Sequence, residues 1–165
     1  GFTDPIEMYF LPGAGSGGTR NFTFDNAASA TSYGAEVEVR RSLSSVFENG
    51  ALSRVGVLVN AALIKTTIDL GGNAVGQSAE RPLMGQSPYV VNAGLYYTDN
   101  ARGLQCNVLY NVIGPRLFAV GTFGSPDIYE VPRNVIDVTA TKSLGKRFEL
   151  KLSVQDLLNQ RVRLM

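Results

Sequence analysis

Residues 148–155 read FELKLSVQ, and this alternation of apolar and polar side chains decides the fold class. Successive side chains of a β-strand point to opposite faces, so Phe148, Leu150, Leu152 and Val154 share one face and the residues between them share the other. In a soluble β-protein the apolar face would pack on a second sheet. In an outer-membrane barrel it meets lipid, and the polar face lines the interior.

The same alternation recurs along the chain and predicts seven strands. They cover residues 5–10 (the end of a first strand), 35–43, 53–68, 87–98, 104–112, 134–142 and 148–156. Every second connection is predicted to be short, at residues 44–49, 99–103 and 143–147, whereas residues 11–31, 69–86 and 114–132 form long loops rich in glycine and proline. Outer-membrane barrels have short periplasmic turns and long extracellular loops. Greek-key sandwiches have no reason to lengthen every second connection.

The composition favours strands over helices as the elements that carry the apolar residues. The chain has 165 residues, and its 44% of hydrophobic residues are spread as alternation, without the run of roughly 20 apolar residues that a transmembrane helix needs. The net charge is +1 and no basic stripe is present, so we expect no nucleic-acid partner. The single cysteine, Cys106, has no partner for an internal disulfide and is interpreted as a small apolar wall residue.

Residues that could carry chemistry are few. The chain has no histidine, which excludes serine and cysteine triads with histidine and the commonest zinc sites within it. Residues 13–18 match a dinucleotide-binding pattern, but the strand-like residues 19–24 follow where a helix is required. Glu36 and Glu38 share a row with Arg40, which favours a solvated face over a paired-carboxylate site. We therefore predict no enzyme, catalytic residue, metal site or cofactor, although composition leaves lysine- and carboxylate-based catalysis open.

Three strings suggest a family. Residues 32–40 (SYGAEVEVR), 85–97 (GQSPYVVNAGLYY) and 152–159 (LSVQDLLN) resemble the C-terminal barrel region of TonB-dependent outer-membrane receptors, especially those of Bacteroidota. The resemblance covers nearly the whole chain. It implies an antiparallel up-and-down transmembrane β-barrel segment that supplies about seven strands of a larger barrel of about 22 strands. Residues 1–165 would form one partial barrel segment that lacks the plug domain, the TonB-binding segment and the last barrel strand.

The resemblance also implies a function and partners. The whole receptor would import a scarce nutrient across the bacterial outer membrane, in contact with membrane lipid, with the plug and other strands of the receptor, and with the TonB complex through the missing N-terminal part. The nutrient itself is not predicted. Phe118, Phe123 and Tyr129, in the long loops, are the candidate ligand-contacting residues, and packing within the loops is the alternative role for each.

Other interpretations stay open at this point. A passive porin-like barrel would need neither plug nor TonB, and a soluble β-sandwich or lipocalin-like binding or adhesion module would bury its apolar face internally. Asp127 and Glu130 could contact a ligand or a calcium ion, although ordinary polar loop residues are the favoured interpretation. Seven strands alone would leave two unpaired edges, which lipid cannot satisfy.

Overall fold

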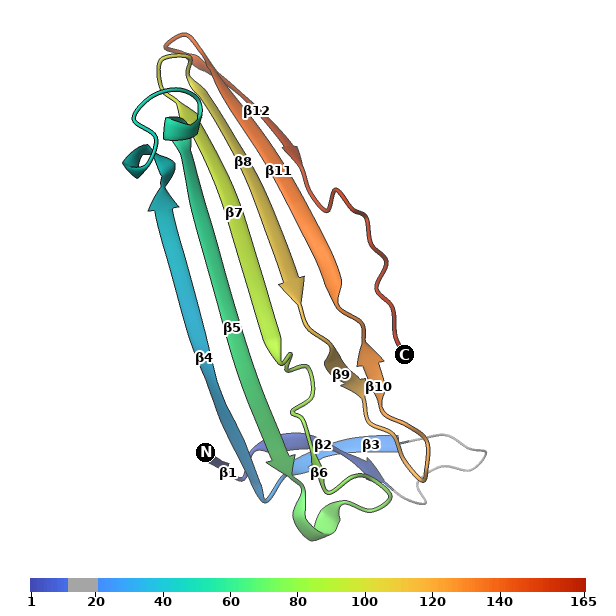
Figure 1. Cartoon of the computed structure of the whole chain (residues 1–165). Coiled ribbons are helices and arrows are strands. Elements are labelled where there is room, and N and C mark those ends of the chain that lie inside the picture. Colours follow the sequence, from blue (N-terminus) through green and yellow to red (C-terminus); the bar gives the residue numbers. More distant parts are fainter. Residues whose placement is uncertain (12–20) are drawn as a thin grey trace.

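The chain folds into antiparallel β-sheets, and the computed structural model describes residues 1–11 and 21–165 (Figure 1). The predicted all-β, antiparallel fold class is confirmed. Among the described residues the main sheet has eight strands, and its order does not close into a barrel. The order is β1 (Phe2–Thr3), β4 (Ser29–Ser42), β5 (Val55–Asp69), β7 (Tyr89–Asp99), β8 (Leu104–Ile113), β11 (Arg133–Leu144) and β12 (Phe148–Val154), with β6 (Glu80–Arg81) paired to the end of β5.

Two hairpins lie outside the main sheet, at the end where the long connections are. The hairpin of β2 (Ile6–Leu11) and β3 (Asn21–Asn26) crosses the ends of β4 and β5 (Figure 1). The hairpin of β9 (Arg116–Ala119) and β10 (Ile128–Glu130) lies in the connection between β8 and β11. The long strands β4, β5, β7, β8, β11 and β12 are neighbours in the main sheet in the order in which they follow along the chain, as in an up-and-down meander.

All seven predicted strands are present: six are the long strands β4, β5, β7, β8, β11 and β12, and the first corresponds to β2. The predicted place of the first strand in the main sheet was wrong, because β2 belongs to a separate sheet. Only the short β1 pairs with β4. The backbone then turns at Asp4, which has a φ of 51°, and at Pro5, so that β2 leaves the sheet and pairs with β3 instead.

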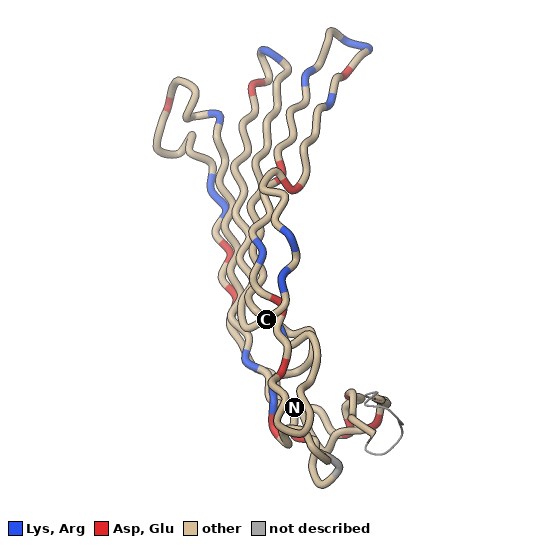
Figure 2. Tube along the Cα trace, turned by 90° about the vertical axis from the view of Figure 1, so that its right-hand side faces the viewer, with Lys and Arg blue, Asp and Glu red and all other residues tan. Residues whose placement is uncertain are grey.

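The predicted alternation of short and long connections is present. We call one end of the sheet the short-turn end, with connections at residues 43–54, 100–103 and 145–147, and the other the long-loop end, with connections at residues 4–28, 70–88 and 114–132. The two ends lie at opposite extremes of the elongated molecule (Figure 2). No helix among the described residues is long and apolar enough to cross a membrane.

The connection between β4 and β5 differs from the predicted tight turn over residues 44–49. It contains two 3₁₀ turns, η1 (Leu43–Ser45) and η2 (Leu52–Arg54); a third, η3 (Gly71–Asn73), lies at the long-loop end. At the start of η1 the hydroxyl oxygen of Ser42 accepts a hydrogen bond from the backbone N–H of Ser44 at 3.3 Å. A serine hydroxyl offers the backbone this local alternative to strand pairing, which ends β4 earlier than alternation alone predicts.

The strand register separates the side chains into two faces. The apolar face consists of the odd-numbered residues of β4, β5 and β7 and the even-numbered residues of β8, β11 and β12; the polar face consists of the others. The middle row of the apolar face runs across five strands without a polar side chain, as Val57, Leu95, Val108, Val138 and Val154, and its register partner on the sixth strand, β4, is Arg41. The predicted faces of β12 are confirmed.

Successive hairpins of the main sheet are offset in one direction. The pairing of β5 with β7 begins at Val55 and Tyr97, and β7 continues for two more residues to Asp99. In the same way, the pairing of β8 with β11 ends at Leu104 and Lys142, and β11 continues for two residues beyond that pair. Each hairpin therefore extends further toward the short-turn end than the one before it.

The small hydrophobic core lies at the long-loop end, where the β2–β3 hairpin meets the ends of β4 and β5. Its buried members come from β2, the β3–β4 connection, β4, the end of β5 and the residue after it, and they are Tyr9, Ala27, Ala30, Ile68 and Leu70, with the partly buried Ala74 and Leu83 packed against them. The apolar face of the long strands carries exposed large hydrophobic side chains, among them Val37, Leu63, Leu95 and Leu152.

Candidate functional site

An ion pair joins the first long connection to the second. A carboxylate oxygen of Glu7 in β2 lies 2.6 Å from Nη1 of Arg81 in β6, and these side chains are 8% and 1% exposed. Nη2 of Arg81 also donates a hydrogen bond to the backbone oxygen of Met8 at 3.2 Å. Each charge would be strongly destabilising if it were buried alone. The pair therefore ties the β2–β3 hairpin to the strand pair at the end of β5.

Tyr9 lies beside this ion pair and is buried. Its hydroxyl donates to the backbone oxygen of Asn26 at 3.1 Å, and the backbone oxygen of Leu70 is 3.4 Å away. Burial raises the pKa of the Tyr9 phenol above its ordinary value, and the negative charge of Asp25 raises it further. The hydroxyl consequently stays protonated and acts as a donor between the first and second connections.

A cavity of about 410 Å³ lies at the long-loop end, between the end of β5, residues 80–88 and the β9–β10 hairpin. Its volume falls within the range of small-molecule sites, about 300–1,000 Å³. The lining combines proline, aliphatic and aromatic surface with a few polar groups: Ile64, Lys65, Thr66, Thr67, Glu80, Arg81, Pro82, Gln86, Pro88, Pro115, Leu117 and Tyr129. Such a lining suits an organic ligand that carries some polar groups.

One of the three candidate aromatic residues, Tyr129, lines this cavity. It lies in β10, opposite the buried Leu117 of β9. The backbone N–H of Tyr129 donates to the oxygen of Met165 at 2.8 Å, and the N–H of Met165 donates back to the oxygen of Tyr129 at 3.0 Å. The end of the chain therefore holds the backbone of Tyr129 in place beside the cavity.

The other two candidates are not brought to the cavity lining. The ring of Phe123 packs edge-on against Phe10, with centroids 5.3 Å apart, and its backbone N–H donates to the oxygen of Gly76 at 2.9 Å. Phe123 thus joins the third connection to the other two. Phe118 lies in β9 with an exposed side chain.

Asp127 and Glu130 bind neighbours within the third connection. A carboxylate oxygen of Asp127 accepts from the backbone N–H of Gly121 at 2.7 Å, and Glu130 accepts from Nε of Arg116 at 2.9 Å. Within residues 1–11 and 21–165 no group of three or more Asp, Glu, His or Cys side chains is placed to hold a metal ion. The glycine-rich residues 13–18 and the two that follow them lie outside the described residues.

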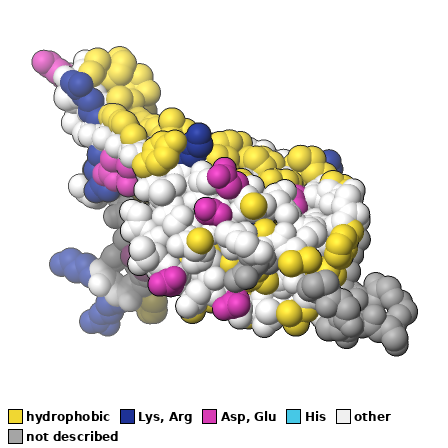
Figure 3. Space-filling view, turned by 90° about the horizontal axis from the view of Figure 1, so that it is seen from below, with side chains coloured by type: hydrophobic (Ala, Val, Ile, Leu, Met, Phe, Trp, Pro, Cys, Tyr) yellow, Lys and Arg dark blue, Asp and Glu magenta, His cyan; other side chains and the backbone are white. Residues whose placement is uncertain are grey.

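Acidic side chains are spread over the long-loop end when the molecule is viewed from below (Figure 3). They include the exposed Asp4, Asp25 and Glu80. Reasoning from the sequence missed the contribution of Glu7 and Arg81, because residues so far apart along the chain give no local pattern. The one available signal was the position of charged residues within otherwise apolar or proline-flanked segments.

The polar face carries a row of hydrogen-bonded side chains across four strands. An amide N–H of Asn111 in β8 donates to the side-chain oxygen of Asn92 in β7 at 2.6 Å, and Asn92 donates to Asn60 in β5 at 3.4 Å. Asn60 in turn donates to the carboxylate of Glu36 in β4 at 2.6 Å. Glu36 therefore belongs to an extended polar row, in agreement with the interpretation of a polar face.

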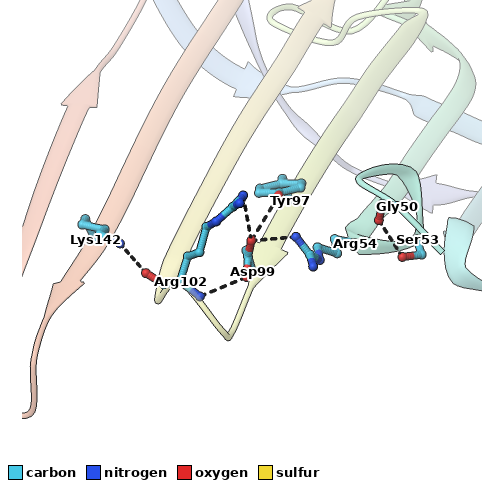
Figure 4. Close-up of polar contacts among 7 residues, drawn as sticks. All are labelled: Gly50, Ser53, Arg54, Tyr97, Asp99, Arg102 and Lys142. Carbon is cyan, nitrogen blue, oxygen red and sulfur yellow. Dashed lines mark hydrogen bonds and ion pairs between the residues drawn. The ribbon is translucent and has the colours of Figure 1, made fainter.

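A second group of charged side chains lies at the short-turn end (Figure 4). The carboxylate of Asp99, at the end of β7, lies 2.7 Å from Nη1 of Arg54 and 3.6 Å from Nη1 of Arg102, and it accepts from the backbone N–H of Arg102 at 3.0 Å. Nζ of Lys142 donates to the backbone oxygen of Arg102. A hydrogen bond to Tyr97 and the charge of Asp99 raise the pKa of the Arg54 guanidinium, so it is always cationic. These contacts link the β4–β5 connection, the β7–β8 connection and β11, the strand that leads into the third short connection.

Comparisons of this chain with family models, curated proteins and solved structures give no match.

Proposed function

We propose that this chain forms part of the barrel wall of a TonB-dependent receptor, which imports a scarce nutrient across the bacterial outer membrane. In this proposal the apolar face contacts membrane lipid and the polar face borders the barrel interior. The long-loop end faces the cell exterior. A plug and further strands complete the receptor, and the TonB complex supplies energy through the plug.

The separation of the two faces carries the proposal. The middle row of the apolar face is aliphatic on five strands, whereas the equivalent part of the polar face carries the row from Glu36 to Asn111. Leu150 and Leu152 on the apolar face are exposed within the described chain. Contiguous exposed apolar surface of this kind requires a partner or a membrane, and lipid outside with a polar interior is the arrangement in outer-membrane barrels.

The stagger of the hairpins and the ends of the sheet support the same proposal. Strands must be tilted and progressively offset before a sheet can close into a barrel, and the offset here has one direction throughout. The sheet order of the described residues ends at β1 and β4 on one side and at β12 on the other. In lipid such edges need further strands, which the remainder of a receptor barrel would provide.

The long-loop end supplies the parts that would contact a nutrient. The cavity lined by Tyr129 lies between the second and third long connections, and the Glu7–Arg81 pair and the Phe10–Phe123 contact hold all three connections together. We assign Tyr129 as the first residue to test for ligand contact, ahead of Phe118 and Phe123, which do not line the cavity.

The native cysteine tests where the apolar face lies. Cys106 is on the apolar face of β8 and its neighbour Asn107 is on the polar face. The complete polypeptide in lipid vesicles is spin-labelled as wild type, as Cys106→Ser, and as Cys106→Ser with Asn107→Cys. The label on Cys106, identified as the signal that is lost in Cys106→Ser, should collide more often with oxygen than with a water-soluble nickel complex. The label on residue 107 should show the opposite preference. Equal or reversed accessibilities would contradict a lipid-facing apolar surface and favour a soluble β-module.

A second experiment separates an energised receptor from a passive porin. The complete polypeptide, extracted from outer membranes in detergent, is mixed with the purified C-terminal domain of TonB. We expect the two to co-purify through the plug-linked segment of the receptor. Lipid accessibility at Cys106 without any TonB binding would favour the porin.

A further inference from the structure

We propose that the short-turn end of the apolar face binds the phosphate groups of anionic glycerophospholipids through a basic rim, defined as Arg41, Arg54, Arg102 and Lys142. The inference rests on the membrane location proposed above and adds to it a lipid class at one boundary of the apolar face.

The basic rim lies where the apolar rows end. On β4 the apolar row passes through Val39 to Arg41, and on β11 it passes through Ala140 to Lys142. Arg54 immediately precedes β5, and Arg102 lies in the turn between β7 and β8. Both arginines contact Asp99, whose place in the register is also on the apolar face (Figure 4).

The rim has a surplus of accessible positive charge. Residues 41–54, 99–104 and 142–149 of the short-turn end carry six cations, the four of the rim with Lys146 and Arg147, against the three carboxylates of Glu48, Asp99 and Glu149, which leaves three positive charges (6 − 3 = 3). The side chain of Asp99 is 1% exposed, whereas those of Arg54 and Arg102 are 42% and 75% exposed. The carboxylate therefore orients the two guanidinium groups from beneath and leaves their outer N–H groups for a ligand. Arg41 is exposed and donates through Nε to the hydroxyl of Ser45 at 3.1 Å.

The opposite boundary of the same face lacks this charge. Toward the long-loop end the same face carries Tyr33 on β4, Lys65 and Asp69 on β5, Tyr89 on β7 and Asn134 on β11, so Lys65, its one cation there among the described strand positions, has a carboxylate on the same strand. In the side view basic residues lie at the tips of the hairpins at the short-turn end, and others lie further along the molecule (Figure 2). On the apolar face itself, the two boundaries therefore differ in charge.

A phosphate group attached to a lipid fits both the basic rim and the apolar face beside it. Guanidinium groups present paired donors that match phosphate oxygens, and an apolar surface bounded by cations matches a lipid whose chains adjoin a phosphate. Tyr97 and Phe148 lie on the apolar face next to the rim, where aromatic side chains are enriched in membrane proteins. An acidic soluble partner would use the cations but leave the adjoining aliphatic rows uncovered.

Lipid selectivity tests the proposal. The complete polypeptide is reconstituted in phosphatidylcholine vesicles, and electron paramagnetic resonance measures the association of spin-labelled phosphatidylglycerol relative to spin-labelled phosphatidylcholine. In low salt we expect a preference of about fivefold for phosphatidylglycerol, the factor that one basic residue near a headgroup gives. The preference should fall toward one in 1 M salt, because salt screens exposed charges.

Matched variants locate the preference. Arg41→Gln with Arg102→Gln should lower it by half or more, whereas Arg40→Gln with Lys151→Gln, which removes the same charge from the polar face near the same end, should leave it unchanged. Equal loss in both pairs, or no preference in the wild type despite an immobilised lipid signal, would overturn the basic rim while the lipid-facing surface stands. Absence of any immobilised lipid would instead contradict the proposed membrane location. The salt series on the wild type decides the matter if a variant fails to assemble.

Discussion

The core at the long-loop end and the apolar face of the strands differ in how they treat apolar side chains. Ile68, near the end of β5, is 0% exposed within the core that includes Tyr9 of β2, whereas Leu63, five residues earlier and on the apolar face of the same strand, is 65% exposed. At the long-loop end the small core and the Glu7–Arg81 pair are buried within the described chain. The apolar face of the strands leaves side chains such as Leu63 exposed, so the stability of the two regions depends on different partners.

The largest expected effect comes from breaking the ion pair at the long-loop end. Arg81→Met leaves Glu7 buried without its partner, which should cost about 3–5 kcal/mol. Native-state hydrogen exchange of the β2 and β3 amides in the complete polypeptide measures the loss. Arg40→Met is the control, because the pair of Arg40 with Glu38 is exposed and 3.7 Å long. Similar small effects for both substitutions would mean that the Glu7–Arg81 pair does not stabilise the long-loop end.

A charge placed on one face of the strands tests their dependence on lipid. Val108→Arg puts a cation in the middle row of the apolar face and should destabilise the assembled protein by about 2–4 kcal/mol. Asn107→Arg, one residue away on the polar face, should cost less than about 1 kcal/mol, because a polar interior solvates it. Urea unfolding in phospholipid vesicles gives both values. Equal costs would argue that the two faces share one kind of environment.

The same comparison explains what the sequence could predict. Strands such as β12 were predictable, since alternation at FELKLSV reports directly on two different environments. The strand at residues 5–10 was predicted, but its pairing with β3 outside the main sheet was not, because the turn at Asp4 redirects a segment whose own pattern is typical of a wall strand. At the candidate site Tyr129 was predicted from its residue type and loop position. Arg81 was not, because its role depends on a partner in another connection.

Tyr9→Phe should have an intermediate effect at the long-loop end, with a pH dependence of its own. Loss of the hydroxyl contacts to Asn26 and Leu70 should cost about 1–2 kcal/mol. Because the folded pKa of Tyr9 is raised, its contribution is fully present below pH 10.0, the ordinary tyrosine value, and is lost as the pH rises through the folded pKa. Exchange of the β3 amides between pH 9 and 11 should show this loss in wild type and not in Tyr9→Phe. Tyr33→Phe, outside the loop-end core, should leave that exchange unchanged.

The smallest expected effect sharpens the comparison on the polar face of the strands. Asn92→Ala removes the middle of the row from Asn111 to Glu36, and in a wet interior the neighbouring amides can bind water instead, so the cost should be about 0.5–1 kcal/mol. Thr98→Ala, at an exposed position of the same face and strand, is the control and should be near neutral. Urea unfolding in vesicles compares them. A loss of about 3 kcal/mol for Asn92→Ala alone would mean that this row is desolvated, as a closely packed plug would make it, because amides left without partners in a dry site bear the full cost of desolvation.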